Sequence, residues 1–179
     1  MIHVSQPMTT VPEHFSTPLQ ELTYRALTEL SIPFQRVEND PAITMEDCQA
    51  IDERLQMQTV KTLFLCNRQQ TAFYLFVTPG DKPFRTKDFS SALGVSRVSF
   101  ASPEQLERMM GTIVGSATVF SLLLPTARDV RVVFDRSLEN SEWYGCSDST
   151  VTGYMKLRTR DVLDRLLPHT GHTLEWVEV

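Results

Sequence analysis

The chain has 179 residues and a mass of 20.4 kDa, the size of one ordinary domain, which can bury a core without a disulfide or a metal ion. Apolar residues make up 41% and charged residues 22%, which excludes collagen-like, coiled-coil and wholly disordered chains. The formal net charge of −5 argues against binding to nucleic acid through bulk positive charge, but leaves open a local basic patch for one RNA end.

Targeting and redox signals are absent from the sequence. The longest apolar run, Val119 to Leu124, has the length of a strand rather than of a membrane span. The first residues lack the basic start and apolar core of a secretory signal, so we expect a cytoplasmic protein without a membrane partner. The cysteines Cys48, Cys66 and Cys146 share no C-x-x-C spacing, which indicates buried thiols and no metal site.

The first half of the chain begins with a polar stretch. Residues 1–17 contain two prolines and predict a flexible N-terminal arm, followed by one domain over residues 18–179. Thr17-Pro18 starts a helix, and Thr44-x-x-Asp47 is typical of a helix N-cap. The predicted elements are a helix over 18–30, a strand over 34–38, a helix over 45–55, a hairpin of strands 60–66 and 71–78, and a helix over 86–93.

The second half continues the alternation of helices and short strands. The predicted elements are a strand over 97–100, a helix over 102–110, strands over 119–124, 130–134, 143–146 and 152–157, a helix over 159–167 and a strand over 173–177. No repeat, linker or change of composition interrupts the chain after residue 17. Helices interleaved with hairpins indicate a single α+β domain built around a mixed, mostly antiparallel sheet.

The histidines restrict the chemistry. His3, His14, His169 and His172 all lie near the ends of the chain. No internal imidazole is available for a Ser-His or Cys-His arrangement. An enzyme with this sequence therefore uses other groups.

Three segments contain residues that are suited to a binding or catalytic site. Lys61 precedes an apolar strand and is placed either to hold a phosphate or carbonyl oxygen in a cleft or to sit in solvent at a strand end. The small residues of 114–118 bring backbone N–H groups close to a ligand, or form an ordinary turn. Ser147 to Thr150 either line a pocket or form a hairpin tip, and no nucleotide-binding motif is present.

The order of several short motifs narrows these alternatives. In chain order they are Tyr24 with Leu30-Ser31-Ile32-Pro33, Glu38-x-x-Pro41-x-x-Thr44, Lys61-x-Leu63-Phe64-Leu65, Pro79-Gly80-Asp81-Lys82, Ser99 to Leu106, Gly115-Ser116 and Asp135-x-x-Leu138. This set resembles the YbaK and prolyl-tRNA synthetase editing-domain superfamily, and within it the free-standing PrdX (ProX) branch. The resemblance covers residues 18–179 and implies that family's barrel-like α+β fold.

The resemblance implies trans-editing, the hydrolysis of the ester that joins a wrong amino acid to tRNA, typically alanine on proline tRNA. It implies that Lys61 is the catalytic-site lysine and that the backbone of Gly115 and Ser116 faces the reacting carbonyl. The positions that it implies for substrate binding are Tyr24, Thr44, Thr62, Ser147 and Ser149. It implies no cofactor and no metal. The implied partners are the aminoacylated 3′ end of tRNA and prolyl-tRNA synthetase.

The sequence departs from the family pattern at several positions. The family's Lys-Asn pair is Lys61-Thr62 here, and a histidine of the alanine-clearing branch falls near Ser147. Valines stand at two positions of the glycine loop, Val114 and Val119, where the family has prolines. Because Thr62 and Ser147 are shorter and offer different hydrogen bonds, the amino acid that is cleared need not be alanine.

Three functions follow as hypotheses. The first is an active aminoacyl-tRNA hydrolase, in which Lys61 holds the phosphate of the terminal adenosine or polarises the ester. The second is a catalytically degenerate member that binds tRNA or a synthetase without hydrolysis, motivated by Thr62 and Ser147. The third, a sensor of a small amino acid, has only a cleft in its favour. A basic face for the acceptor stem and an evenly mixed surface remain equal alternatives.

Overall fold

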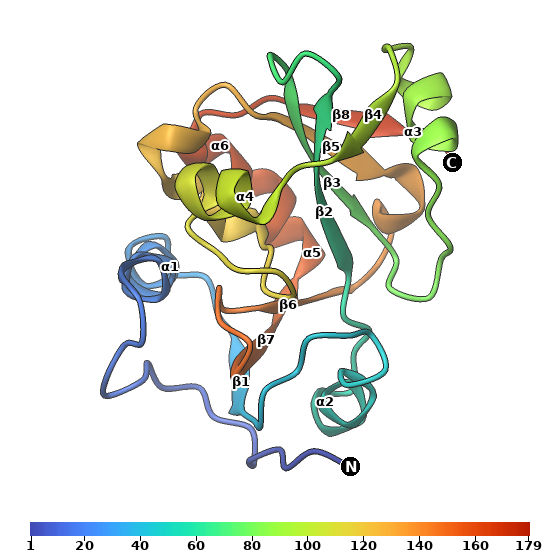
Figure 1. Ribbon diagram of the computed structural model, residues 1–179. Helices are drawn as coiled ribbons and strands as arrows, with labels where there is room; N and C mark the ends of the chain where they lie inside the picture. The colour runs from blue at the N-terminus through green and yellow to red at the C-terminus, as the bar shows by residue number, and fades with distance from the viewer.

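The computed structural model describes all residues from 1 to 179 and contains two open β-sheets (Figure 1). The smaller sheet is antiparallel, with strand order β1-β7-β6, and the larger is mixed, with order β4-β2-β3-β5-β8. In the larger sheet β4, β2 and β3 are antiparallel, whereas β3, β5 and β8 are parallel. The strands are β1 (Gln35–Glu38), β2 (Lys61–Asn67), β3 (Phe73–Thr78), β4 (Val98–Phe100), β5 (Arg131–Asp135), β6 (Trp143–Ser147), β7 (Gly153–Arg158) and β8 (Leu174–Val177).

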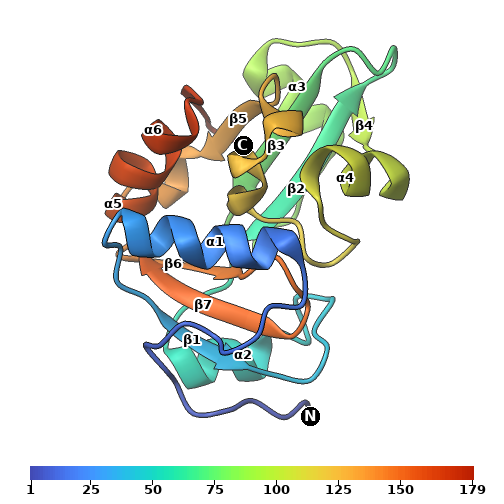
Figure 2. The same ribbon diagram turned by 90° about the vertical axis from the view of Figure 1, so that its left-hand side faces the viewer.

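The helical elements cover the faces of both sheets. They are α1 (Pro18–Glu29), α2 (Gln49–Leu55), α3 (Thr86–Leu93), α4 (Pro103–Met110), η1 (Val119–Leu123), η2 (Pro125–Ala127), η3 (Arg136–Leu138), α5 (Thr159–Asp161), η4 (Val162–Leu166) and α6 (Leu167–Thr170). Figure 2 shows the smaller sheet lying between α1 and α2. The main core lies between the inner faces of the sheets and includes Leu75, Phe134, Tyr144 and Leu157. None of the helices has the length and apolar character needed to cross a bilayer.

The two sheets meet where β2 begins. Thr59 forms a parallel bridge with Gly145, and the Val60 N–H donates to the Gly145 carbonyl at 2.8 Å. A Cβ atom on Gly145 would lie 2.7 Å from the carbonyl oxygen of Gln58, so only glycine permits this approach of the chains. The expectation of an α+β domain with a mixed sheet is confirmed. The single barrel-like sheet is not found, because the strands divide into two sheets joined by this short contact.

Most predicted elements occur in the structure near their predicted bounds. The hairpin of β2 and β3 is present, α3 ends at Gly94 in the left-handed conformation, and α4 begins with a capping box between Ser102 and Gln105. The helix predicted over 45–55 begins only at Gln49. The Asp47 carboxylate accepts hydrogen bonds from the N–H groups of Ile43 and Thr44, which closes a separate turn before the helix.

One predicted strand is wrong. Residues 119–123 form the 3₁₀ helix η1, which starts where the Thr118 hydroxyl accepts a hydrogen bond from the Phe120 N–H. Val119 and Phe120 are fully buried. A short apolar run that is buried all round has no periodicity, so the sequence does not distinguish a buried strand from a buried helix here.

The helix predicted over 159–167 is present and extends to residue 170. It changes from α-helix to a π-turn over Val162–Leu166 and back to α-helix at Leu167. Pro168 follows directly and has no N–H to donate to the preceding turn. The wider turn thus lies where the regular hydrogen-bond ladder is already interrupted.

The N-terminal segment pairs with β1 through residues 4–8. Met8 and Arg36 exchange two backbone hydrogen bonds of 2.8 Å, and the Ser5 N–H donates to the Glu38 carbonyl at 2.8 Å. Val4 contributes to the small core between β1 and α2. The boundary expected at residue 18 coincides with the first residue of α1. The flexibility of the arm in solution stays a prediction.

Candidate functional site

A pocket of about 520 Å³ lies where the two sheets meet. Its lining is mostly apolar and comes from five stretches of chain, within residues 43–48, 59–64, 100–106, 114–117 and 146–154. The pocket opens along β2 because the neighbouring strand, β4, pairs only with residues 65–67 of β2. The first residues of β2 pair with β3 on one edge only, and their other edge is open at the pocket.

Lys61 is the first residue of β2 and lines this pocket in a half-buried position. Its Nζ donates a hydrogen bond of 2.7 Å to the backbone carbonyl of Lys82 and contacts no carboxylate. An ammonium group has three N–H donors. Two of them thus remain for a ligand, while the third fixes the position of the side chain.

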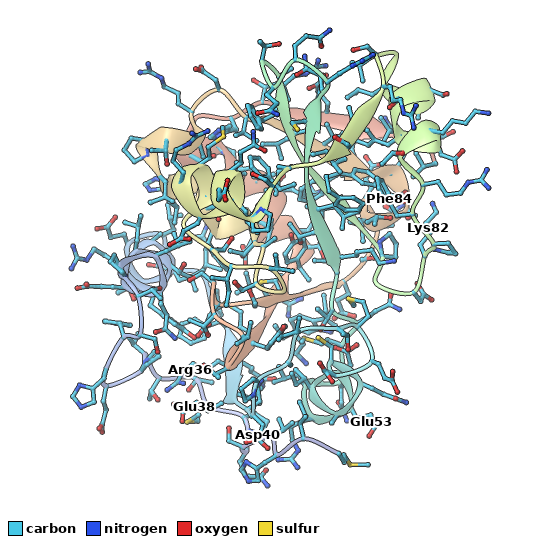
Figure 3. The ribbon with its side chains drawn as sticks, viewed as in Figure 1. Arg36, Glu38, Asp40, Glu53, Lys82 and Phe84 are labelled. Carbon is cyan, nitrogen blue, oxygen red and sulfur yellow. The ribbon has the colours of Figure 1, made fainter.

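Lys82 is held from the other side by a buried carboxylate. Its Nζ lies 2.8 Å from Asp135 Oδ2, which also accepts a hydrogen bond of 2.8 Å from the Thr78 hydroxyl. Burial raises the pKa of Asp135, but hydrogen bonds from Lys82 and from Ser137 outweigh burial and lower it below its ordinary value. The loop between β3 and α3, where Figure 3 labels Lys82 and Phe84, is thus fixed in contact with Lys61.

A second wall of the pocket is the loop of residues 112–118, which closes a tight turn. The Ser116 N–H donates to the Ile113 carbonyl at 3.1 Å, while the N–H groups of Gly115 and Ala117 have no acceptor within the protein. Gly115 has a φ of +96°, and a Cβ atom there would lie 2.7 Å from Ile43 Cγ2. Gly115 and Ala117 both line the pocket, so their N–H groups are the candidate donors to a carbonyl oxygen.

The third wall is the loop after β6. The Ser147 hydroxyl donates to the Ser116 carbonyl at 3.3 Å and accepts from the Ser149 N–H at 3.2 Å. The Thr118 hydroxyl donates to the Ser147 carbonyl at 3.4 Å. These bonds join the loop to the glycine turn. Ser147 lines the pocket, but its hydroxyl is engaged within the protein.

The loop after β6 is held in place by the buried side chain of Asp148. It is 1% exposed and accepts hydrogen bonds from the Tyr24 hydroxyl at 2.8 Å, from Gln20 Nε2 at 2.9 Å and from the Thr150 hydroxyl at 2.6 Å. Burial, and next the nearby Asp148 charge, raise the pKa of Tyr24, so its hydroxyl keeps its proton. Asp148 was not among the residues predicted for the site. Its only local signal is an acidic residue next to Ser147.

The residues predicted for the site divide into two groups. Those that line the pocket are Lys61, Gly115, Thr44, Thr62 and Ser147. The others lie behind its walls: Ser116 is buried in the glycine turn, Tyr24 packs in the main core, and Ser149 is buried with a positive φ of 77°. The roles of all eight residues stay predictions.

The pocket contains one cation and no group suited to acid–base catalysis at neutral pH. No histidine, aspartate or glutamate is among its lining residues. Burial raises the pKa of the thiols of Cys48 and Cys146, which therefore stay protonated and are poor nucleophiles. Nowhere in the chain do three or more His, Cys, Asp or Glu side chains gather in a way that could hold a metal ion. What the pocket offers to a substrate is therefore shape, Lys61 and backbone N–H groups.

A family model described as the aminoacyl-tRNA editing domain matches residues 39–164, well over half of the chain. The chain belongs to this family. The match includes Lys61, the glycine turn and Ser147, and so spans all three walls of the pocket. The resemblance inferred from the ordered motifs is thereby confirmed.

Relatives of this editing domain are found both in sequence and in structure. The prolyl-tRNA editing protein ProX of Acetoanaerobium sticklandii is 28% identical over 153 residues, which cover 86% of this chain and 93% of that protein. The solved structure of a candidate trans-editing enzyme for prolyl tRNA synthetase has a TM-score of 0.65 at 18% identity, covering 92% of this chain and 99% of that one. The hypothetical protein APE2540 has a TM-score of 0.68 at 19% identity, covering 87% and 98%. The two structures show that the fold is shared.

Proposed function

We propose that this editing domain hydrolyses the ester between a wrong amino acid and the 3′ end of a tRNA. The observation that carries the proposal is that Lys61, at the open edge of β2, lines the same pocket as Gly115 and Ala117, whose N–H groups have no acceptor within the protein. Membership of the aminoacyl-tRNA editing family supports the class of substrate. The related prolyl-tRNA editing protein ProX supports proline tRNA as the tRNA. The resemblance of the sequence motifs to the family supports alanine or another small amino acid as the group that is removed.

The proposed reaction needs no protein base. A water molecule attacks the carbonyl carbon of the ester, the bond from that carbon to the ribose oxygen breaks, and the ribose oxygen takes a proton. The products are a free amino acid and a tRNA with a free 3′ end. The ester is already activated, and the neighbouring ribose hydroxyl positions the water, so the protein supplies placement and stabilisation of negative charge.

Each wall has its own role in this proposal. Lys61 contacts the ester or the adjoining phosphate with the two N–H groups that Lys82 leaves available. The N–H groups of Gly115 and Ala117 donate to the carbonyl oxygen as it becomes negative. Thr62 and Ser147 lie beside the amino acid. Because the Ser147 hydroxyl is engaged within the protein, it limits the size of that side chain more than it binds polar groups.

The partners follow from the substrate. We propose the aminoacylated end of tRNA as the ligand and prolyl-tRNA synthetase as the enzyme that supplies the mischarged species, on the support of the prolyl-tRNA editing relative. The acidic net charge of −5 fits a protein that binds a tRNA end in a small pocket better than one that covers the whole tRNA.

The test is a deacylation panel with proline tRNA carrying alanine, serine, threonine or cysteine. We expect hydrolysis of at least one of these, and a loss of about a hundredfold or more in kcat/KM for Lys61→Ala, the usual size for removal of a group that stabilises charge. The matched control is Lys156→Ala, which changes a half-buried lysine on β7 outside the pocket, stacked on Trp143. The control should retain full turnover.

Two results would contradict the proposal. The first is no hydrolysis of any member of the panel by the unchanged protein. Binding of tRNA without turnover would then support the alternative, a degenerate member that binds tRNA or a synthetase, which the engaged Ser147 hydroxyl favours. The second is hydrolysis that Lys61→Ala leaves intact, which would remove Lys61 from the mechanism.

A further inference from the structure

Three of the eight exposed large apolar side chains of the protein line the pocket. Ile43, Phe100 and Val114 line the pocket and are 53%, 58% and 59% exposed. We call these three residues the apolar rim. Large apolar side chains with half or more of their surface in water cost free energy in a monomer, and a cluster of them marks a surface that binds something.

The position of Phe100 is fixed by its neighbours. It is the last residue of β4 and pairs with Leu65 of β2. Its ring makes an edge contact with Phe84, with ring centres 5.7 Å apart and planes at 71°. Phe84 in turn packs against Phe76 and Phe89 in the core of the larger sheet (Figure 3 labels Phe84). Phe100 is therefore an exposed aromatic ring on a rigid support.

We infer that Phe100 is the platform on which the terminal adenine base of the tRNA stacks; this inference rests on the proposed function. Unpaired RNA ends are bound in proteins chiefly by stacking of their bases on aromatic side chains. The aminoacyl ester is joined to the ribose of that adenosine. With the ester between Lys61 and Gly115, the base emerges at the mouth, where Phe100 lies.

The rest of the apolar rim fits the same ligand. Ile43 packs against Gly115, the direct neighbour of Val114 in the glycine turn. Ile43 and Val114 are aliphatic and present no hydrogen-bonding group to the mouth, as suits the face of a base rather than its edge. Lys61, at the pocket wall, is available for the phosphate or the ester. An apolar surface next to an ammonium group suits a nucleotide, which has a flat base beside an anionic phosphate.

The experiment measures binding rather than hydrolysis. An RNA oligonucleotide that ends in CCA is titrated into the protein, and compared with the same oligonucleotide whose last residue lacks its base. The unchanged protein should bind the complete end more tightly, by about tenfold, the usual contribution of one stacked base. Phe100→Ala should remove this preference, Phe100→Leu should remove most of it, and Phe100→Trp should restore it.

The matched control is Ile113→Ala. Ile113 is 58% exposed like Phe100 and is the direct neighbour of Val114, but it does not line the pocket. It should leave the preference unchanged. In deacylation assays Phe100→Ala should raise KM about tenfold with little change in kcat, because stacking is equally strong before and during the reaction.

Several outcomes would overturn the inference. The complete and base-free oligonucleotides could bind equally, Phe100→Ala could match the unchanged protein, or Ile113→Ala could lose as much affinity as Phe100→Ala. A concentration-dependent dimer that Phe100→Ala dissociates would assign the apolar rim to a second copy of the chain instead. Binding that depends on Phe100 in a protein without turnover would leave this inference standing while the proposed function fails, so the two are separable.

Discussion

Two walls of the pocket are each fixed by a buried aspartate, but in different ways. On the Lys61 side, Asp135 is 1% exposed and pairs with the ammonium of Lys82 at 2.8 Å. On the side of the Ser147 loop, Asp148 is also 1% exposed, yet its hydrogen bonds come from neutral donors, among them Tyr24 and Gln20. One wall is thus stabilised by an ion pair and the other by a hydrogen-bonded carboxylate without a cation in contact.

The two walls should therefore respond differently to the loss of their aspartate. The Lys82 side chain is 31% exposed, so solvent weakens the ion pair and its partner can re-solvate when Asp135 is lost. The partners of Asp148 are buried and have no access to water once the carboxylate is removed. The Ser147 wall should therefore matter more for folding, and the Lys61 wall more for turnover and for pH dependence.

The largest effect on stability is expected for Asp148→Ala. The change leaves the Tyr24 hydroxyl and the Gln20 amide buried without acceptors, and should lower the free energy of unfolding by about 3–5 kcal/mol. Urea unfolding followed by circular dichroism measures it. Asp164→Ala, which removes an exposed carboxylate paired with Arg160, is the control and should cost little. A decrease of less than about 1 kcal/mol for Asp148→Ala would show that the Ser147 wall does not contribute more to stability than the Lys61 wall.

For Asp135→Asn we expect a smaller decrease in the free energy of unfolding, about 2 kcal/mol at neutral pH. The pKa of Asp135 is lowered in the folded protein, so its contribution is complete above the unfolded value of 3.8 and is lost as the pH falls through the lower folded value. The gap in stability between the unchanged protein and the variant should therefore be constant near pH 7 and close below about pH 4.

Turnover gives a second measurement on the same variant. Because the Lys82 carbonyl holds Lys61 Nζ, loosening Lys82 should reduce kcat on a mischarged tRNA, though by less than Lys61→Ala does. Lys82→Met should reduce kcat in the same way, whereas Lys82→Arg, which keeps a cation next to Asp135, should largely retain it. A pH-independent gap in stability, or a variant with unchanged kcat, would contradict the assignment of this pair to the Lys61 wall.

For Tyr24→Phe we expect the smallest decrease in the free energy of unfolding, about 1.5 kcal/mol, because only one of several hydrogen-bond donors to Asp148 is lost. The Tyr24 ring stays in the core, and its hydroxyl does not reach the pocket, so KM for the mischarged tRNA should not change. Measuring the unfolding free energy together with KM decides the role of this residue. A raised KM at unchanged stability would return Tyr24 to the substrate-binding residues that the sequence suggested.

Local features of the fold follow from the sequence, because neighbours along the chain determine them. The capping box of Ser102 and Gln105, the end of α3 at Gly94 and the hairpin of β2 and β3 are all short-range patterns. The place of Lys61 before an apolar strand made it a candidate, and the order of the motifs along the chain implied its role in the site. The strand predicted over 119–124 was wrong because a short, largely buried segment has no exposed polar face that would reveal its period.

Long-range pairing is what the sequence did not reveal. The division into two sheets depends on a contact between Thr59 and Gly145, and nothing near either residue predicts it. The role of Asp148 likewise depends on donors more than 120 residues away in the chain. Phe100 looked like an ordinary strand residue until its exposure at the pocket was known.

The sequence alone thus determined the α+β class, the family and a lysine that lines the pocket, because these rest on local patterns and on their order along the chain. Only the tertiary structure decided which of the predicted site residues line the pocket. It placed Thr62 and Ser147 in the pocket and Tyr24 and Ser149 behind it. The physical reason is that a side chain's surroundings depend on segments distant in sequence, whose packing buries one hydroxyl and leaves another at the pocket surface.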